Sequence, residues 1–185
     1  RNGPTWTARI SLLAIPLLAV ALSRRRGPRV FTKAELAQYV DTRRGLKVAI
    51  CGQVFDVTKG AEFYAKGAGY GFFAGRDASL AFATGNFKTN LTDNVSSLAD
   101  AQLLDLQNWV NETYHKKYVY EGVVAGYFYD AKGQPTEDHL RFDERVEKAR
   151  EAAARQALDV EKYPDCASRR TQSARSVSCK KGRVP

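Results

Sequence analysis

The spacing of apolar residues predicts a helix in the middle of the chain. Leu103, Leu106 and Val110 recur at helical spacing, and Trp109 widens the apolar face that they form. Residues 97–100 precede this pattern and offer side chains that can cap a helix. We therefore expect one amphipathic helix here, with its apolar face packed on a core.

A second, longer helix is predicted over residues 137–162, with Thr136 as its N-cap. Its apolar stripe is thin and consists of Phe142, Val146, Ala149, Ala153 and Ala157. Most of the remaining positions are Glu, Arg or Lys, and many stand four residues from an opposite charge. This helix should pack on the domain or dock on another subunit.

Shorter patterns predict strands and turns. β-Branched and aromatic residues indicate two strands, 47–51 and 53–57, that turn about Gly52, and a third strand over 118–129. Thr32 can cap a short helix, with Glu35 completing a capping box. Asp77 can cap a helix over 78–83, while residues 85–97 read as a polar loop and 132–135 as a turn.

An apolar run over residues 10–22 stands apart from these patterns. Thirteen apolar residues are short for a membrane span, and the run resembles a signal-peptide core. With Arg9 and Arg24 at its two ends, we expect it to stay in place as a single N-terminal membrane anchor. The basic cluster after it favours a cytoplasmic or organelle-matrix side for the rest of the chain. The sequence leaves open which membrane holds the anchor, the mitochondrial inner membrane or an endomembrane of the secretory system.

The net charge of +9 is concentrated at the two ends of the chain. Residues 1–34 carry seven Arg or Lys and no acid, and residues 166–185 carry six and no acid. Residues 35–165 then hold 16 basic and 20 acidic residues, so the central region is mildly acidic. A nucleic-acid surface needs clustered cations on the folded face, so nucleic acid is not an expected partner.

The three cysteines fall in two different settings. Cys51 lies in an apolar stretch and is expected to be a core residue. Cys166 and Cys179 enclose a short polar loop without a nearby histidine, which does not make a zinc site. A disulfide between them is the favoured alternative. It would imply an oxidising compartment, which conflicts with the side favoured by the basic cluster.

Residues 62–79, EFYAKGAGYGFFAGRDAS, combine aromatic residues with glycines. Glycine lets the backbone turn sharply and approach a flat ligand closely, while aromatic side chains supply apolar walls. Such a loop can line a flat apolar pocket and direct a tyrosine into it. The alternative is an aromatic core loop with glycine turns and no ligand.

Several motifs resemble the membrane-associated progesterone receptor family, a cytochrome b5-like haem-binding group. They are FTKAEL (31–36), CGQVFDVTKG (51–60), FY (63–64), GYGFFAGRDAS (69–79) and KKY (116–118). The resemblance covers roughly residues 30–130 and continues into the cysteine-bearing tail, where relatives carry a similar cysteine pair. It implies an α+β cytochrome b5-like domain over 30–130. Residues 1–29 would be an anchor with a basic linker, and 131–185 a long charged helix with a basic, cysteine-containing tail.

The resemblance also implies a haem b site. Tyr70 falls on the position of the axial iron ligand, and Tyr64, Lys117 and Tyr118 fall on positions around the haem. A phenolate suits ferric iron, provided that nearby groups stabilise the anion. Lys117 could pair with a propionate or with the phenolate, and Tyr118 could hydrogen-bond Tyr70.

Histidine is a weaker candidate for the iron ligand. The only two histidines, His115 and His139, are expected to lie on the surface, which disfavours bis-histidine ligation. No nucleophile elbow, phosphate loop or dinucleotide motif is present, so no catalytic residue is expected.

The expected function is thus that of a membrane-anchored haem-binding protein, which binds or delivers haem or regulates a partner haem or redox enzyme. Its expected partners are a membrane and a protein or membrane complex, and steroid binding is left open. The alternative is a haemless accessory subunit of a membrane complex, such as an organelle respiratory complex. In that case the cytochrome b5-like scaffold would serve for docking.

Overall fold

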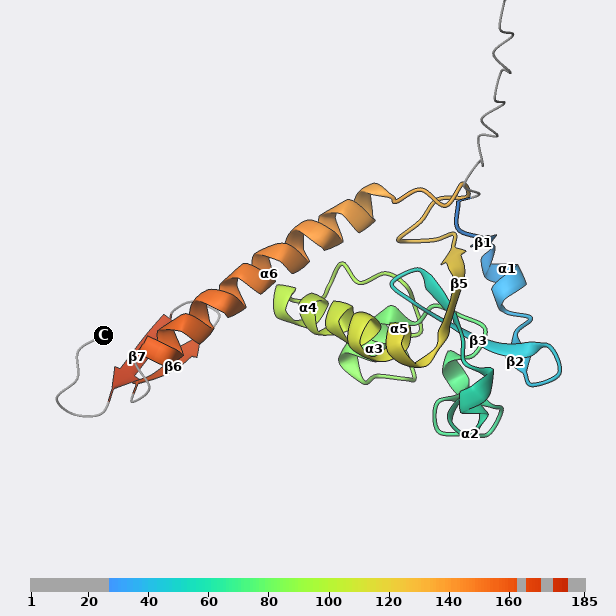
Figure 1. The fold of residues 1–185 in the computed structure, drawn as a ribbon, viewed down its shortest axis with the longest axis horizontal. Coiled ribbons are helices and arrows are strands. Elements are labelled where there is room, and N and C mark those ends of the chain that lie inside the picture. The colour runs from blue at the N-terminus through green and yellow to red at the C-terminus, as the bar shows by residue number, and fades with distance from the viewer. Residues whose placement is uncertain (1–26, 163–165, 171–174, 180–185) are drawn as a thin grey trace, which may run out of the picture.

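A five-stranded sheet with strand order β1-β5-β4-β3-β2 forms one side of the domain. The computed structural model describes residues 27–162, 166–170 and 175–179, with side chains up to residue 158 (Figure 1). The strands are β1 (Val30–Phe31), β2 (Val40–Asp41), β3 (Gly45–Ile50), β4 (Gln53–Asp56) and β5 (Val119–Val124). Only β1 and β5 pair in parallel, which brings the start of the domain beside its last strand.

Short helices fill the long excursion between β4 and β5. They are η1 (Thr58–Gly60), α2 (Ala61–Tyr64), η2 (Gly71–Phe73), α3 (Ser79–Thr84), α4 (Asp100–Trp109), the π-helix η3 (Val110–Tyr114) and α5 (His115–Lys117). A further short helix, α1 (Lys33–Leu36), lies between β1 and β2, and Thr32 caps it as predicted by accepting from the Glu35 backbone N–H at 3.0 Å. The core lies between the sheet and α3–α4.

The turn between β3 and β4 corrects the prediction for Cys51. Cys51 is fully buried, but it lies in the two-residue turn and not in a strand. Its φ of 51° and the φ of 72° at Gly52 are both left-handed, as tight antiparallel hairpins prefer. A Cβ at Gly52 would lie 2.6 Å from the Tyr129 ring, so only glycine fits there.

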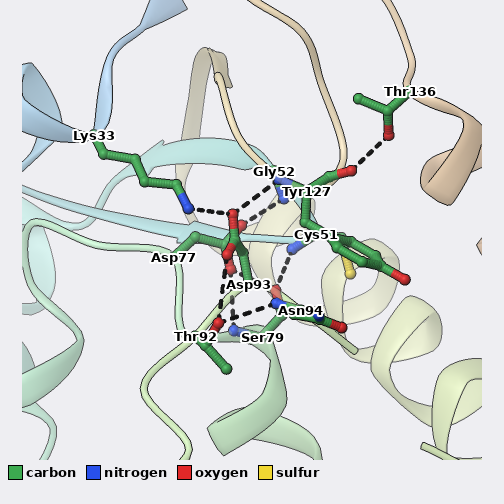
Figure 2. A network of polar contacts seen from close by, with 10 residues as sticks. All are labelled: Lys33, Cys51, Gly52, Asp77, Ser79, Thr92, Asp93, Asn94, Tyr127 and Thr136. Atoms are coloured by element: carbon green, nitrogen blue, oxygen red, sulfur yellow. Dashed lines mark hydrogen bonds and ion pairs between the residues drawn. The ribbon is translucent and has the colours of Figure 1, made fainter. Parts of the chain in front are cut away.

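Asp77 connects this turn to α3 (Figure 2). Its Oδ2 accepts from the Gly52 N–H at 2.7 Å, and its Oδ1 accepts from the Ser79 N–H at 3.0 Å and from the Ser79 hydroxyl at 2.5 Å. The Ser79 hydroxyl oxygen accepts in turn from the Cys51 N–H at 2.7 Å. The predicted cap is therefore wrong in detail: α3 begins at Ser79, and Asp77 holds that residue against the β3–β4 turn.

A second buried aspartate holds the loop after α3. Asp93 pairs with the Lys33 ammonium at 2.8 Å and accepts from the Tyr127 N–H at 2.9 Å (Figure 2). A Cβ at Gly126 would lie 2.3 Å from the Asp93 carboxylate, so glycine is needed for this approach. Asp93 thus fastens the predicted polar loop to the start and the end of the domain.

The predicted apolar face is buried as expected, with Leu103 and Leu106 in α4 and Val110 at the start of η3. The cap of α4 differs from the prediction, because the Gln102 side chain accepts from the Ala99 N–H at 3.1 Å. The predicted strand 118–129 is also shorter, since β5 ends at Val124 and the chain then turns.

Helix α6 (Glu137–Lys162) has the predicted bounds, and Thr136 accepts from the His139 N–H at 3.2 Å at its start. Its first half packs on α4 through Phe142, Val146 and Ala149, which are buried. Ala153 and Ala157 are exposed, so the predicted stripe is covered along only half of the helix, which extends beyond α4 (Figure 1).

Several predictions fall outside what the structure describes. The predicted anchor, residues 10–22, lies outside the described residues. Among the residues that are described, none of the helices combines the length and apolarity that a membrane crossing requires. Strands β6 (Cys166–Arg170) and β7 (Arg175–Cys179) pair with Cys166 opposite Cys179. Their side chains are not among those described, so the disulfide stays a prediction, as do the domain limits.

Candidate ligand-binding pocket

A cavity of about 490 Å³ opens between the aromatic loop and the helical segment α4–η3–α5. Phe63, Tyr64, Tyr70 and Phe73 line it from the loop, and Phe82, Ala83 and Phe87 line it from α3 and the segment after it. The wall opposite the loop is formed by one face of α4–η3–α5 and by Tyr118. The volume and the aromatic lining suit a flat, largely apolar small molecule.

Tyr70 lies at the mouth of this cavity. Its backbone N–H donates to the Phe63 carbonyl at 2.9 Å, which folds the loop back on itself. A Cβ at Gly71 would lie 2.6 Å from the Ala65 carbonyl oxygen, so the fold-back requires glycine at this position. The Tyr70 ring packs against Tyr64 and Phe73, with centroids 6.3 and 6.2 Å apart, and 46% of the residue stays exposed.

Tyr64 is buried beneath Tyr70 and forms a pair with Tyr114. Their hydroxyl oxygens lie 2.5 Å apart, and the two residues are only 7% and 1% exposed. Burial raises the pKa of Tyr64 to about 12, against a smaller opposing effect of the hydrogen bond with Tyr114, and burial also raises the pKa of Tyr114. Both phenols are therefore protonated at neutral pH and act as hydrogen-bonding groups.

Lys117 and Tyr118 complete the predicted set on the opposite wall. The Tyr118 ring stands edge-on to Tyr64, with centroids 6.0 Å apart. Gly60 makes room for it, since a Cβ there would lie 2.9 Å from the Tyr118 hydroxyl. Lys117 is exposed and makes no ion pair with the side chains that the structure describes. The structure thus brings Tyr64, Tyr70, Lys117 and Tyr118 together around one cavity.

Most of the helical wall was not predicted from the sequence. Gln102, Asp105, Trp109 and Thr113 also line the cavity, at intervals of three or four residues that continue to Lys117. This second periodic face was the available signal, but it is mostly polar and stands beside the stronger apolar face. The sequence pattern places Trp109 on the apolar face, but in the structure it lines the pocket and is 51% exposed.

Neither histidine lines the cavity. His115 is exposed as predicted, and its Nε2 lies 2.8 Å from the Gln53 side-chain oxygen. His139 is not a surface histidine, because its side chain is only 13% exposed. Its Nδ1 lies 3.1 Å from the Phe128 carbonyl, and the ring packs against Phe128 and Tyr129. His139 therefore fixes the start of α6 on the core.

The residues around the cavity fit a haem group. The walls are aromatic, a half-exposed phenol can supply an oxygen ligand to iron, and a free ammonium at the rim can pair with a carboxylate. In the described part of the chain, no group of three or more His, Cys, Asp or Glu side chains could hold a bare metal ion.

The chain is similar in sequence to several known proteins. Neuferricin homologues are similar in sequence to most of this chain. The neuferricin homologue of Drosophila melanogaster is 43% identical over 143 residues, which are 74% of this chain and 49% of that protein. Neuferricin of Mus musculus is 37% identical over 166 residues, or 86% of this chain and 63% of that protein. The chain therefore spans about half to two thirds of the length of these relatives.

A solved structure and a family model give two further comparisons. A putative steroid-binding protein from Arabidopsis is 35% identical over 54% of this chain and all of that chain, with a TM-score of 0.49. The model of the cytochrome b5-like heme/steroid binding domain matches residues 32–127, which is more than half of the chain. On that match, the chain belongs to the cytochrome b5-like haem/steroid-binding domain family.

Proposed function

We propose that this domain binds ferric haem b in the cavity, with Tyr70 as the axial ligand of the iron. The observation that carries the proposal is the convergence of Tyr64, Tyr70, Lys117 and Tyr118, from segments far apart in the sequence, on one aromatic cavity. An aromatic loop that served only for packing would close on its neighbours at the density of a protein interior, whereas this one leaves a cavity of about 490 Å³.

Tyr70 suits the ligand role better than its neighbours do. Tyr64 and Tyr114 are buried and hydrogen-bonded to each other, and burial raises the pKa of both. Tyr70 stands at the mouth with almost half of its surface exposed, so its oxygen can reach a ligand without breaking a buried contact. Lys117 would pair with a propionate, and the aromatic walls would exclude water from the porphyrin faces.

The proposed role is to bind haem, to deliver it, or to regulate a partner haem enzyme. When bound, ferric haem on a single tyrosine would supply an iron centre with one face free for a small ligand or a partner. A tyrosinate ligand favours the ferric state, which suits binding and delivery better than rapid electron relay. We propose no catalytic residue. We propose membrane attachment and a protein partner as well.

A haem titration of the purified protein, followed by absorption, tests the proposal. We expect saturation at one haem per chain, because the cavity holds one flat ligand. Thr113→Trp should abolish uptake by filling the cavity, since Thr113 lines it. Asn108→Trp is the matched control, because Asn108 is exposed on α4 and does not line the cavity. Uptake that Thr113→Trp leaves intact would place haem elsewhere.

The haemless accessory subunit is the second candidate, and the outer half of α6 favours it. Ala153, Ala157 and Leu158 are exposed there, and Leu158 keeps 65% of its surface. A protein that takes up no haem and co-purifies in a large membrane assembly would support this second function over the first.

A further inference from the structure

The Tyr64–Tyr114 pair has one more hydrogen-bond donor than its internal bond uses. Each phenol carries one O–H, and a single hydrogen bond of 2.5 Å joins the two oxygens. Whichever phenol donates, the O–H of the other is left to find an acceptor elsewhere. Since both residues are more than nine-tenths buried, that acceptor must lie inside the fold or in the cavity.

The surroundings of Tyr114 decide which O–H is left over. Its ring is enclosed by Phe55, Phe82 and Tyr118, with centroids 5.4, 5.9 and 5.4 Å away. Among the described residues, Tyr64 is the only hydrogen-bond partner of its hydroxyl. If Tyr64 donated, the Tyr114 O–H would be buried without an acceptor, which is costly. Tyr114 is therefore the donor, and the Tyr64 O–H is free.

On the cavity side, the rings nearest to Tyr64 also carry hydroxyl oxygens that can accept its O–H. The rings of Tyr70 and Tyr118 lie 6.3 and 6.0 Å from the Tyr64 ring, and all three residues line the cavity. A phenol that accepts one hydrogen bond becomes a stronger donor in the next. Tyr114 thus both directs and strengthens the donor that Tyr64 offers to the oxygens around Tyr70.

The π-helix η3 is what makes this pairing possible. An α-helix advances 3.6 residues per turn, so one extra residue in a turn rotates all later positions by about 100°. In an unbroken α-helix, Tyr114 would lie about 80° around the axis from Leu106 and about 140° from Trp109. With the extra residue, Leu106, Trp109 and Tyr114 all line the same cavity.

We propose that Tyr114 is a positioning residue of the haem site: it donates to Tyr64 and thereby fixes the Tyr64 O–H as a donor toward Tyr70. The inference rests on the proposed function, because its consequence is a weaker bond between the Tyr70 oxygen and iron. The residue acts only through Tyr64 and touches no haem atom itself in this role.

A double-mutant cycle tests this assignment. Ferric haem is loaded into the wild-type chain, Tyr114→Phe, Tyr64→Phe and the double variant. The tyrosinate absorption band and the rate of haem transfer to an excess of apomyoglobin are then measured. Tyr114→Phe should move the band in the same direction as Tyr64→Phe and change the transfer rate roughly 2- to 10-fold, the effect of about one hydrogen bond. In the Tyr64→Phe background, Tyr114→Phe should have no further effect.

The outcomes separate this inference from the function on which it rests. Additive effects of the two substitutions, or a Tyr114→Phe protein that loses stability with an unmoved band, would show a purely structural role and overturn the inference alone. A wild-type chain that takes up no haem would overturn the proposed function and the inference with it. Tyr120→Phe is the control, because Tyr120 is exposed on β5 and does not line the cavity.

Discussion

The end and the middle of the loop 62–79 show how a framework differs from a binding site. Near its end, Asp77 accepts three hydrogen bonds, from Gly52 and Ser79, and both of its oxygens are used (Figure 2). In its middle, Tyr70 is half exposed beside a cavity. Asp105 and Lys117, on the opposite wall, have no ion pair among the described side chains. Satisfied groups fasten the loop, whereas free groups leave binding capacity for a ligand.

The difference also explains why the cavity persists. The Asp77 network joins the β3–β4 turn to α3, and the Asp93 contacts fasten the segment after that helix. These bonds fix the backbone that follows the loop aromatics and the segment that carries Phe82 and Phe87. Substitutions in this framework and at the cavity should therefore have effects of different kinds.

The largest expected effect comes from Asp77→Ala. The substitution leaves the buried Gly52 and Ser79 N–H groups without their acceptor, so the free energy of unfolding should fall by about 3 kcal/mol. Asp105→Ala is the matched control and should change it by less than about 0.5 kcal/mol, because Asp105 is exposed. Urea unfolding at pH 5 measures both. Equal losses would mean that the two regions do not differ as described.

The pH dependence of stability tests the same contrast. Burial raises the pKa of Asp77 to about 6 from its ordinary 3.8. The folded state therefore holds this proton more tightly than the unfolded state, and the stabilisation is present at pH 4 and lost as pH rises through 6. We expect the free energy of unfolding to fall by about 2–3 kcal/mol between pH 4 and pH 6. Most of this fall should be absent in Asp77→Ala.

Asp93 should change the free energy of unfolding in the opposite direction, and at lower pH. Burial alone would raise its pKa, but hydrogen bonds and the Lys33 charge hold it below the ordinary value. Its contribution is thus present above about pH 4 and lost only as pH falls further. Urea unfolding from pH 3 to 7 separates the two windows. A wild-type stability that stays flat between pH 4 and 6 would contradict the assignment to Asp77.

The smallest expected effect is at the cavity rim. Lys117→Gln should weaken haem binding about 2- to 5-fold by removing a solvent-exposed ion pair with a propionate. Binding of haem dimethyl ester, which has no free carboxylate, should not change. Lys116→Gln is the control, because Lys116 pairs with Glu112 outside the cavity. An equal loss with the ester would assign Lys117 to packing.

Local signals in the sequence predicted the elements with strong caps or strong periodicity. Thr136 and the charged first turn located the start of α6, and Leu103, Leu106 and Val110 identified the buried face of α4. Only motif resemblance pointed to Tyr64, Tyr70, Lys117 and Tyr118 as a set. No local pattern relates residues that lie about fifty positions apart and meet only in the fold.

The features that escaped prediction depend on tertiary contacts. Cys51 occupies a left-handed turn that suits glycine or asparagine better, and its φ is imposed by the strands on either side. The π-helix η3 breaks the periodicity of α4, so the cavity position of Tyr114 could not be predicted by extending the helical pattern. The exposure of Ala153 and Ala157 follows from the length of α4, which ends the packing surface before α6 ends.

The central claim is that Tyr70 binds the iron, and the ferric absorption spectrum of Tyr70→Phe tests it most directly. The substitution keeps the ring and removes only the oxygen, with Tyr120→Phe as the control outside the cavity. We expect the wild-type and control spectra to share a tyrosinate band, and the Tyr70→Phe protein to lose both that band and most of its haem. A Tyr70→Phe protein with an unchanged ferric spectrum at full haem content would contradict the claim.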